Sequence, residues 1–161
     1  MFKSAVISGC ERYRYQLVRQ WRDDADSKVL HWVMLNPSTA DADLDDPTIR
    51  KCIGFARFNG FDGISVVNLF AYRSTSPKEL TWQRGRVDVV GPENDLWISK
   101  IPLNATVVCA WGSYIEQQPS LWWRHNAVKN MLAGRDLRCV KLSRQPWHPL
   151  YVKYGPLLEF E

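Results

Sequence analysis

The sequence contains the segment KVLHWVMLNP at residues 28–37. Residues 29–35 form a nearly continuous apolar run, interrupted by His31, and the run stops abruptly at Asn36-Pro37. A strand that is covered on both faces of a parallel sheet has this composition, because neither of its faces meets water. The run is far shorter than the roughly 18–20 apolar residues that cross a bilayer. We therefore predict a buried parallel strand here and no transmembrane helix.

Similar segments follow and alternate with helical patterns. Further strands are expected at 63–69, 105–111 and 137–142, and helices at 47–58, 78–83, 96–100 and 121–132. Residues 2–8 and 12–19 alternate polar and apolar side chains around a Gly-Cys-Glu turn, which predicts a β-hairpin. The pattern predicts an α/β fold, a three-layer sandwich with a central four-stranded, mainly parallel sheet flanked by helices, plus the N-terminal β-hairpin.

Length and composition favour one domain over residues 1–161. The chain has 161 residues, and typical domains have about 100–200. Its 45% hydrophobic and 24% charged residues match globular proteins and exclude disordered or low-complexity classes. The N-terminus lacks the apolar stretch of a signal peptide, so a cytoplasmic location is expected.

Charge and cysteine content limit the possible partners and sites. The 21 basic and 17 acidic residues give a net charge of +4, which permits DNA as a partner without requiring it. The four cysteines are widely separated and lack zinc-knuckle or redox spacing, and Cys109 and Cys139 are expected to be buried. The eight tryptophans are either core residues or, like Trp147, rim residues able to stack on a flat ligand.

The expected strands end in polar clusters at one edge of the sheet, where α/β proteins bind ligands. The clusters are Asn36-Pro37-Ser38-Thr39-Ala40-Asp41, Asn68 with Tyr72-Arg73, Gly112-Ser113, and Arg144-Gln145-Pro146-Trp147-His148-Pro149. The amide of Asn36 could orient a water or a carbonyl, and the Ser38 and Thr39 backbone N–H groups could hold an anion. A tight turn capped by Asn36 explains the same residues equally well. His148 lies on a proline-restricted loop after the last expected strand. A lone loop histidine is commonly just exposed, but this position favours a functional role for His148 over His31 and His125.

Four carboxylates lie within six residues, at Asp41, Asp43, Asp45 and Asp46. Such a group could bind magnesium or supply a general base. Helix capping accounts for Asp46, and a solvated acidic loop accounts for Asp43 and Asp45. Asp41, close to the Asn36-Pro37 turn, therefore remains the candidate base, and no metal or cofactor is implied.

Taken in order, these positions resemble the uracil-DNA glycosylase superfamily, and most of all its mismatch-specific thymine/uracil branch. Met34-Leu35-Asn36-Pro37-Ser38 resembles the Gly-Ile-Asn-Pro-Gly strand end of that branch, and His148-Pro149-Leu150 resembles its His-Pro-Ser-Pro motif. Ser38 and Leu150 depart from the expected residues. Residues 36–41, 67–73, 91–95 and 148–151 resemble still more a bacterial and phage family of unknown function.

The resemblance implies a role for each matching residue. Asn36 would position the attacking water, His148 would stabilise negative charge on the departing base, and Asn68 would read the base edge. Pro37, Ser38, Thr39, Tyr72, Arg73, Gly112 and Trp147 would bind the substrate, while Arg144 and Lys153 would contact the nucleic acid. The function implied is hydrolysis of the N-glycosidic bond of a flipped-out uracil, mismatched or modified base in single- or double-stranded DNA.

Two other functions fit the same residues. One is a hydrolase or transferase that acts on free nucleotides or nucleosides, with little dependence on salt. The other is a non-catalytic nucleic-acid-binding module of the same fold, since a fold does not by itself imply a function. No obligate protein partner is inferred for any of the three.

Overall fold

In the computed structural model, which describes residues 1–83 and 85–161, seven strands form one sheet in the order β1-β2-β4-β3-β5-β6-β7. The strands are β1 Phe2–Ile7, β2 Arg14–Gln20, β3 Val29–Met34, β4 Gly63–Asn68, β5 Thr106–Cys109, β6 Asp136–Cys139 and β7 Leu158–Glu159. The four inner strands β4, β3, β5 and β6 run parallel, and the β1–β2, β2–β4 and β6–β7 pairs are antiparallel.

The prediction of an α/β fold with an N-terminal hairpin is confirmed, but a four-stranded, mainly parallel sheet is wrong. The hairpin is part of the sheet, because β2 pairs with the outer edge of β4 through Leu17 and Val66. On the opposite side the short β7 pairs with β6 through Leu158 and Cys139. Both additions supply partners for backbone N–H and C=O groups that would otherwise be left at the edges of the parallel strands.

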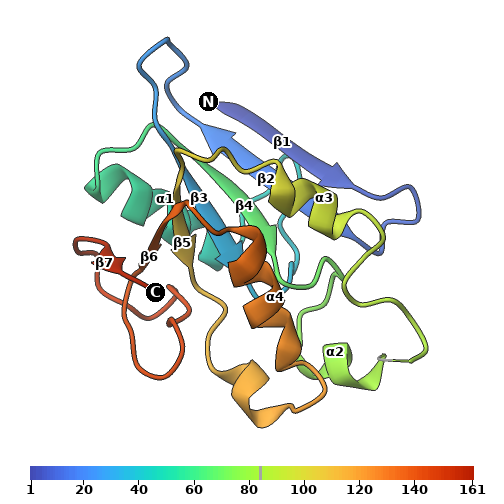
Figure 1. Ribbon diagram of the computed structural model, residues 1–161. Coiled ribbons are helices and arrows are strands. Elements are labelled where there is room, and N and C mark those ends of the chain that lie inside the picture. The colour runs from blue at the N-terminus through green and yellow to red at the C-terminus, as the bar shows by residue number, and fades with distance from the viewer. Residues whose placement is uncertain (84) are drawn as a thin grey trace.

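The helices lie on both faces of the sheet (Figure 1). They are α1 Pro47–Phe58, α2 Lys78–Trp82, α3 Asn94–Ser99 and α4 Trp123–Met131, with a 3₁₀ helix at Tyr114–Gln117. Helix α1 begins where expected, because the Asp46 side chain accepts a 2.8 Å hydrogen bond from the Ile49 N–H and Pro47 occupies the first turn. It covers one face, whereas α3 and α4 cover the other.

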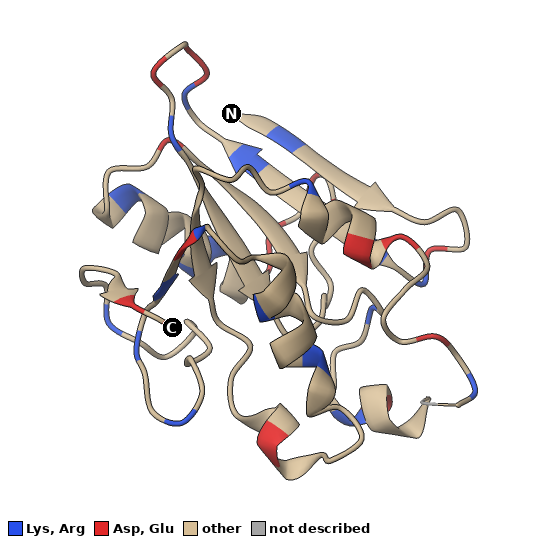
Figure 2. Ribbon diagram, in the orientation of Figure 1, with Lys and Arg blue, Asp and Glu red and all other residues tan. Residues whose placement is uncertain are grey.

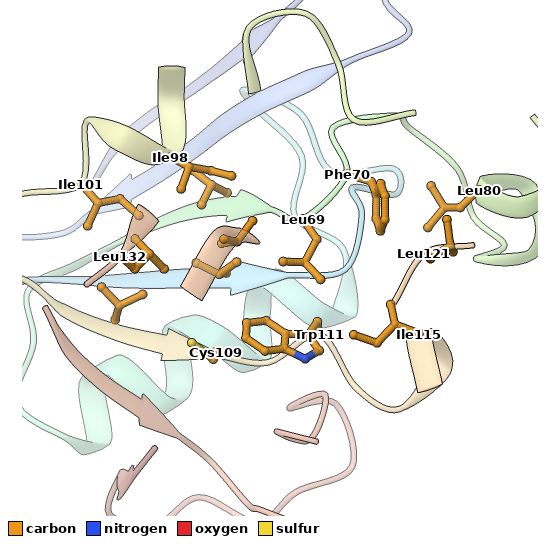
Figure 3. Close-up of a cluster of buried hydrophobic side chains, with 14 of the residues drawn as sticks. Leu69, Phe70, Leu80, Ile98, Ile101, Cys109, Trp111, Ile115, Leu121 and Leu132 are labelled. Atoms are coloured by element: carbon orange, nitrogen blue, oxygen red, sulfur yellow. The ribbon is translucent and has the colours of Figure 1, made fainter. Parts of the chain in front are cut away.

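Each face has its own apolar core. On the α1 face, Trp32 of β3 packs edge-on against Phe55 of α1, with ring centroids 6.2 Å apart. On the α3/α4 face, Trp111 and Cys109 pack with residues such as Ile98 and Leu132 (Figure 3). Burial raises the pKa of the Cys109 thiol, as expected for a cysteine that serves as a small apolar residue.

Within the described residues, no helix combines the length and apolar character needed to cross a membrane.

Gly91 provides a test of the packing of the segment before α3 against the hairpin strand β2. Its φ is +96°, and a Cβ added there would lie 3.0 Å from the Ala71 Cβ and 3.1 Å from the Tyr15 ring. A Gly91→Ala substitution is therefore expected to lower the free energy of unfolding by about 2 kcal/mol, from backbone strain and overpacking. Urea denaturation measures this change. A Gly9→Ala variant, in which the new Cβ meets nothing within 4 Å, is the control and should unfold almost like the wild type.

Candidate functional site

A cavity of about 300 Å³ opens at the carboxyl ends of β3 and β4. Its wall includes Met34 and Asn68, the last residues of these strands, and Trp111, which follows β5. The chain leaves β3 toward α1 on one face of the sheet and leaves β5 toward α4 on the other. Neighbouring strands whose connections diverge in this way create the crevice in which open α/β sheets bind ligands.

Asn36 is held in the pocket wall by the loop that follows β4. Its Nδ2 donates hydrogen bonds to the Ser74 carbonyl at 3.1 Å and to the Pro37 carbonyl at 3.3 Å. The Ser74 N–H in turn donates to the Pro37 carbonyl at 2.9 Å, which ties the loop after β4 to the loop after β3. Since Nδ2 is engaged by the protein, Oδ1 is the atom of Asn36 that can accept a hydrogen bond from a water or ligand.

His148 also lines the pocket, and its tautomer is set by the loop after β6. The Leu150 N–H donates a 3.2 Å hydrogen bond to Nδ1 of His148. A ring nitrogen that accepts a hydrogen bond carries no proton, so the neutral ring bears its proton on Nε2. Gly112, with φ +76°, lies beside this histidine, and its N–H donates to the Pro146 carbonyl at 2.9 Å. The loop therefore presents an N–H donor from His148.

The pKa of His148 is lowered from its usual 6.5, because the protein around the ring removes water that would stabilise the imidazolium; the nearby Asp46 charge acts in the opposite direction. We therefore expect the His148 Cε1–H resonance to titrate with a midpoint below pH 6.5 in an NMR pH series. Any activity that needs the neutral ring should be present above that midpoint and decline as the pH falls through it. A midpoint at or above 6.5 would contradict this expectation, and the resonance that disappears in His148→Asn identifies His148 among the three histidines.

Asn68 is almost fully buried in β4, where its side chain reaches the pocket. Asn94 fixes the main chain there, because its Nδ2 donates to the carbonyls of Asn68 and Leu69 at 3.0 and 3.1 Å. Nδ2 of Asn68 has no hydrogen-bond partner among the residues that the structure describes. This N–H donor is therefore available to a ligand or water in the pocket, and pairing it would remove a cost of about 1–3 kcal/mol.

The two charged residues of the pocket wall, Arg14 and Asp46, were not predicted as site residues. Asp46 was expected only to cap α1; it does so, and it also lines the pocket. Arg14, at the start of β2, lines the same pocket although the sequence places it in the hairpin. No local signal singles out Arg14, because residues 12–19 alternate polar and apolar side chains and Arg14 is one polar position of that pattern.

Asp41 lies outside the pocket wall, in contrast to the expectation of a catalytic base there. Its Oδ1 accepts hydrogen bonds from the backbone N–H groups of Asp43 at 2.9 Å and Leu44 at 2.8 Å. These bonds stabilise the carboxylate and lower its pKa. The Asp41 carboxylate therefore stabilises a local turn, whereas we expected it to activate a water.

The other expected residues are divided between the pocket and its surroundings. Ser38 lines the pocket, whereas Pro37 is buried outside the pocket wall and Thr39 is exposed. Arg73 donates a 3.2 Å hydrogen bond to the Glu11 carbonyl, and Tyr72 packs edge-on against Tyr13, both outside the pocket wall.

On the loop after β6, the exposed Trp147 lies 4.1 Å from the Lys141 ammonium and donates a 3.2 Å hydrogen bond to the Ser143 hydroxyl. Arg144 and Lys153 are exposed. Within the two described ranges, no three His, Cys, Asp or Glu side chains are grouped to hold a metal ion.

A family model described as a protein of unknown function (DUF1643) matches residues 14–150. The matched segment begins at Arg14 and ends at Leu150, and both of these residues line the pocket. Neither the curated proteins nor the solved structures include a significant match to the chain.

Proposed function

The chain belongs to the DUF1643 family, whose function is unknown, and from its site we propose that it is an N-glycosylase that removes a flipped-out uracil, mismatched or modified base from DNA. One observation supports this most: Asn36, Asn68 and His148, which come from three separate segments, line one pocket. The glycosylase resemblance implies that Asn36 positions the water, that Asn68 reads the base edge and that His148 stabilises the departing base.

The hydrogen bonds of these residues fit the two requirements of the reaction. Breaking an N-glycosidic bond develops positive charge on the sugar and negative charge on the base, so the enzyme needs a placed water and a donor to the base. In our proposal Oδ1 of Asn36 holds the water, and Nε2–H of His148 donates to the base. Hydrogen-bond donors aimed at developing charge stabilise the transition state more than the ground state.

Asp46 replaces Asp41 as the carboxylate of the proposed mechanism. It is the acidic residue of the four at 41–46 that lines the pocket. One of its oxygens, Oδ1, accepts the hydrogen bond from the Ile49 N–H, which fixes the group in place. We assign Asp46 to stabilising the positively charged sugar and to accepting the proton of the water, since both tasks need a carboxylate close to the reacting carbon.

The pocket and its surroundings are compatible with a single extruded nucleotide. A cavity of about 300 Å³ lies at the small end of the range for ligand pockets. Flipping a base costs a few kcal/mol of unstacking, which stacking and phosphate contacts offset. Trp147 and Arg144 are exposed on the loop that carries His148, so we assign them to stacking and phosphate contacts beside the pocket. Basic and acidic residues are interspersed over the fold (Figure 2), which favours moderate rather than tight DNA affinity.

A base-release panel tests the proposal against the two other functions. Single- and double-stranded oligonucleotides carrying uracil, a mismatched thymine or a modified base are compared with the matching free nucleosides and nucleotides, at low and high salt. Glycosylase activity predicts release from DNA that weakens with salt, because phosphate contacts displace counterions. Release only from the free nucleosides or nucleotides would support the hydrolase instead. DNA binding without any release would support the non-catalytic module.

A further inference from the structure

Among the residues that the structure describes, three arginine side chains are almost completely buried, and one of them differs from the other two. Arg14, Arg19 and Arg124 are exposed by 3%, 0% and 1%. Arg19 donates to the Asp45 carboxylate at 2.7 Å, and Arg124 donates to Asp95 at 2.6 Å. Arg14 has one acceptor, the Ala40 carbonyl at 2.9 Å, and forms no ion pair with any described residue. Arg14 is therefore a buried cation without a contacting anion.

The surroundings of Arg14 leave part of its hydrogen-bonding capacity unused. Its Nε has no partner among the described residues, and the same is true of Nδ2 of Asn68 in the same pocket. Burial lowers the pKa of Arg14 to about 10, and the field of Asp46 partly opposes this shift without an ion pair. The guanidinium is still charged at neutral pH. Keeping the Arg14 charge and these two N–H donors away from water is costly in free energy unless a ligand provides a negative charge and hydrogen-bond acceptors.

We propose that Arg14 forms an oxyanion subsite, in which its guanidinium donates to a ligand oxygen that carries negative charge. Guanidinium groups match such oxygens well, because their N–H donors lie in one plane and can form two parallel hydrogen bonds. The carboxylate of Asp46 in the same pocket disfavours a ligand with several negative charges. The subsite therefore suits one phosphate group, or one oxygen of a base that becomes anionic as it departs, rather than a polyphosphate.

This subsite deepens the proposed function, and it can be tested separately from base release. Isothermal titration calorimetry of the intact protein uses inorganic phosphate, uracil, deoxyuridine and deoxyuridine monophosphate as four separate probes. A phosphate subsite binds phosphate and the monophosphate but not deoxyuridine. A base-oxygen subsite binds uracil and deoxyuridine but not inorganic phosphate. No binding of any probe by the wild type at millimolar concentration would overturn the subsite.

Variants of Arg14 show whether the guanidinium is responsible. Arg14→Met is expected to weaken binding of the preferred probe by about 10- to 100-fold, since a charge-assisted hydrogen bond is lost. Arg14→Lys keeps the charge but not the planar donors and should bind with intermediate affinity. The matched control is Arg57→Met, which removes an exposed positive charge from the end of α1. Folded Arg14 variants that bind like the wild type would overturn the proposal.

The wild type alone provides a second measurement in case the variants do not fold. The Nε–H resonance of Arg14 should shift downfield when the preferred probe is added, because this group gains an acceptor; an unchanged resonance at saturation would contradict the subsite. A protein that binds through Arg14 but releases no base would refute the glycosylase and leave the oxyanion subsite in place.

Discussion

Base release by an Asn36→Ala variant is expected to be about 100- to 1,000-fold slower than by the wild type, with little change in substrate affinity. This size is typical when one group that positions a reactant or stabilises the transition state is removed from a preorganised site. The physical reason is that Oδ1 of Asn36 is the acceptor left free by the bonds from Nδ2 to Ser74 and Pro37. Single-turnover kinetics with an excess of protein over oligonucleotide measure this rate.

Asn126→Ala is the matched control for Asn36→Ala. Asn126 is an exposed asparagine of α4 that lies outside the pocket wall. Its replacement should leave the rate within about threefold of the wild type, because surface substitutions rarely perturb a distant group. Thermal unfolding of both variants separates a loss of catalysis from a loss of folding. A folded Asn36→Ala protein with more than a third of the wild-type rate would refute the role given to Asn36.

The second large expected effect is a loss of stability when Arg19, which anchors the loop that leads to Asp46, is replaced. Arg19 is fully buried, and its guanidinium donates to Asp45 and to the carbonyls of Asp41 and Leu44. Arg19→Met would remove the guanidinium from the Asp45 carboxylate and from the Asp41 carbonyl at the entrance to α1, leaving Asp45 only the ammonium of Lys3 at 4.0 Å. Breaking a buried ion pair from one side typically costs about 3–5 kcal/mol, and we expect a loss of about 3 kcal/mol because Asp45 retains some contact with water. Urea denaturation measures it.

The exposed ion pair of Arg22 and Asp24 is the comparison for Arg19. Both side chains are about half exposed, at 52% and 50%, although Nε and Oδ2 are only 2.6 Å apart. Arg22→Met should leave the urea midpoint of unfolding almost unchanged, because water screens exposed pairs. If Arg19→Met were as mild as Arg22→Met, the anchoring role of Arg19 would be wrong.

Strand β3 and the start of α1 could be predicted because residues close together in the sequence determine them. The apolar run ending at Asn36-Pro37 predicts β3, and the Asp46-Pro47 pair predicts the start of α1. The full sheet could not be predicted. Strand β7 has two residues, too few for an alternating pattern, and only its pairing with Cys139 makes it a strand. Such pairing depends on the tertiary fold rather than on propensity.

The candidate site could be predicted in part, for a geometric reason. Asn68 ends a parallel strand, and Asn36 and His148 follow two others. The carboxyl ends of parallel strands lie at the same edge of the sheet, so these three side chains could be expected close together. Arg14 could not be found in this way, because β2 runs antiparallel to β4 and its first residue therefore lies beside the end of β4. The hydrogen bond from the Arg14 N–H to the Ala71 carbonyl shows this proximity. The structure departs from the prediction for Asp41 because the backbone N–H groups of the following residues form hydrogen bonds with its carboxylate, which is then engaged within the loop.

The most direct test is the release of free base from an oligonucleotide set that carries uracil, mismatched thymine and modified pyrimidines, in single- and double-stranded form. Abasic sites are detected by alkaline cleavage, for the wild type, Asn36→Ala and His148→Ala in parallel. Our account predicts that the wild type leaves abasic sites in at least one substrate and that both variants are at least about 100-fold slower. No abasic site in any substrate with the wild type, or equal release by folded variants, would contradict it.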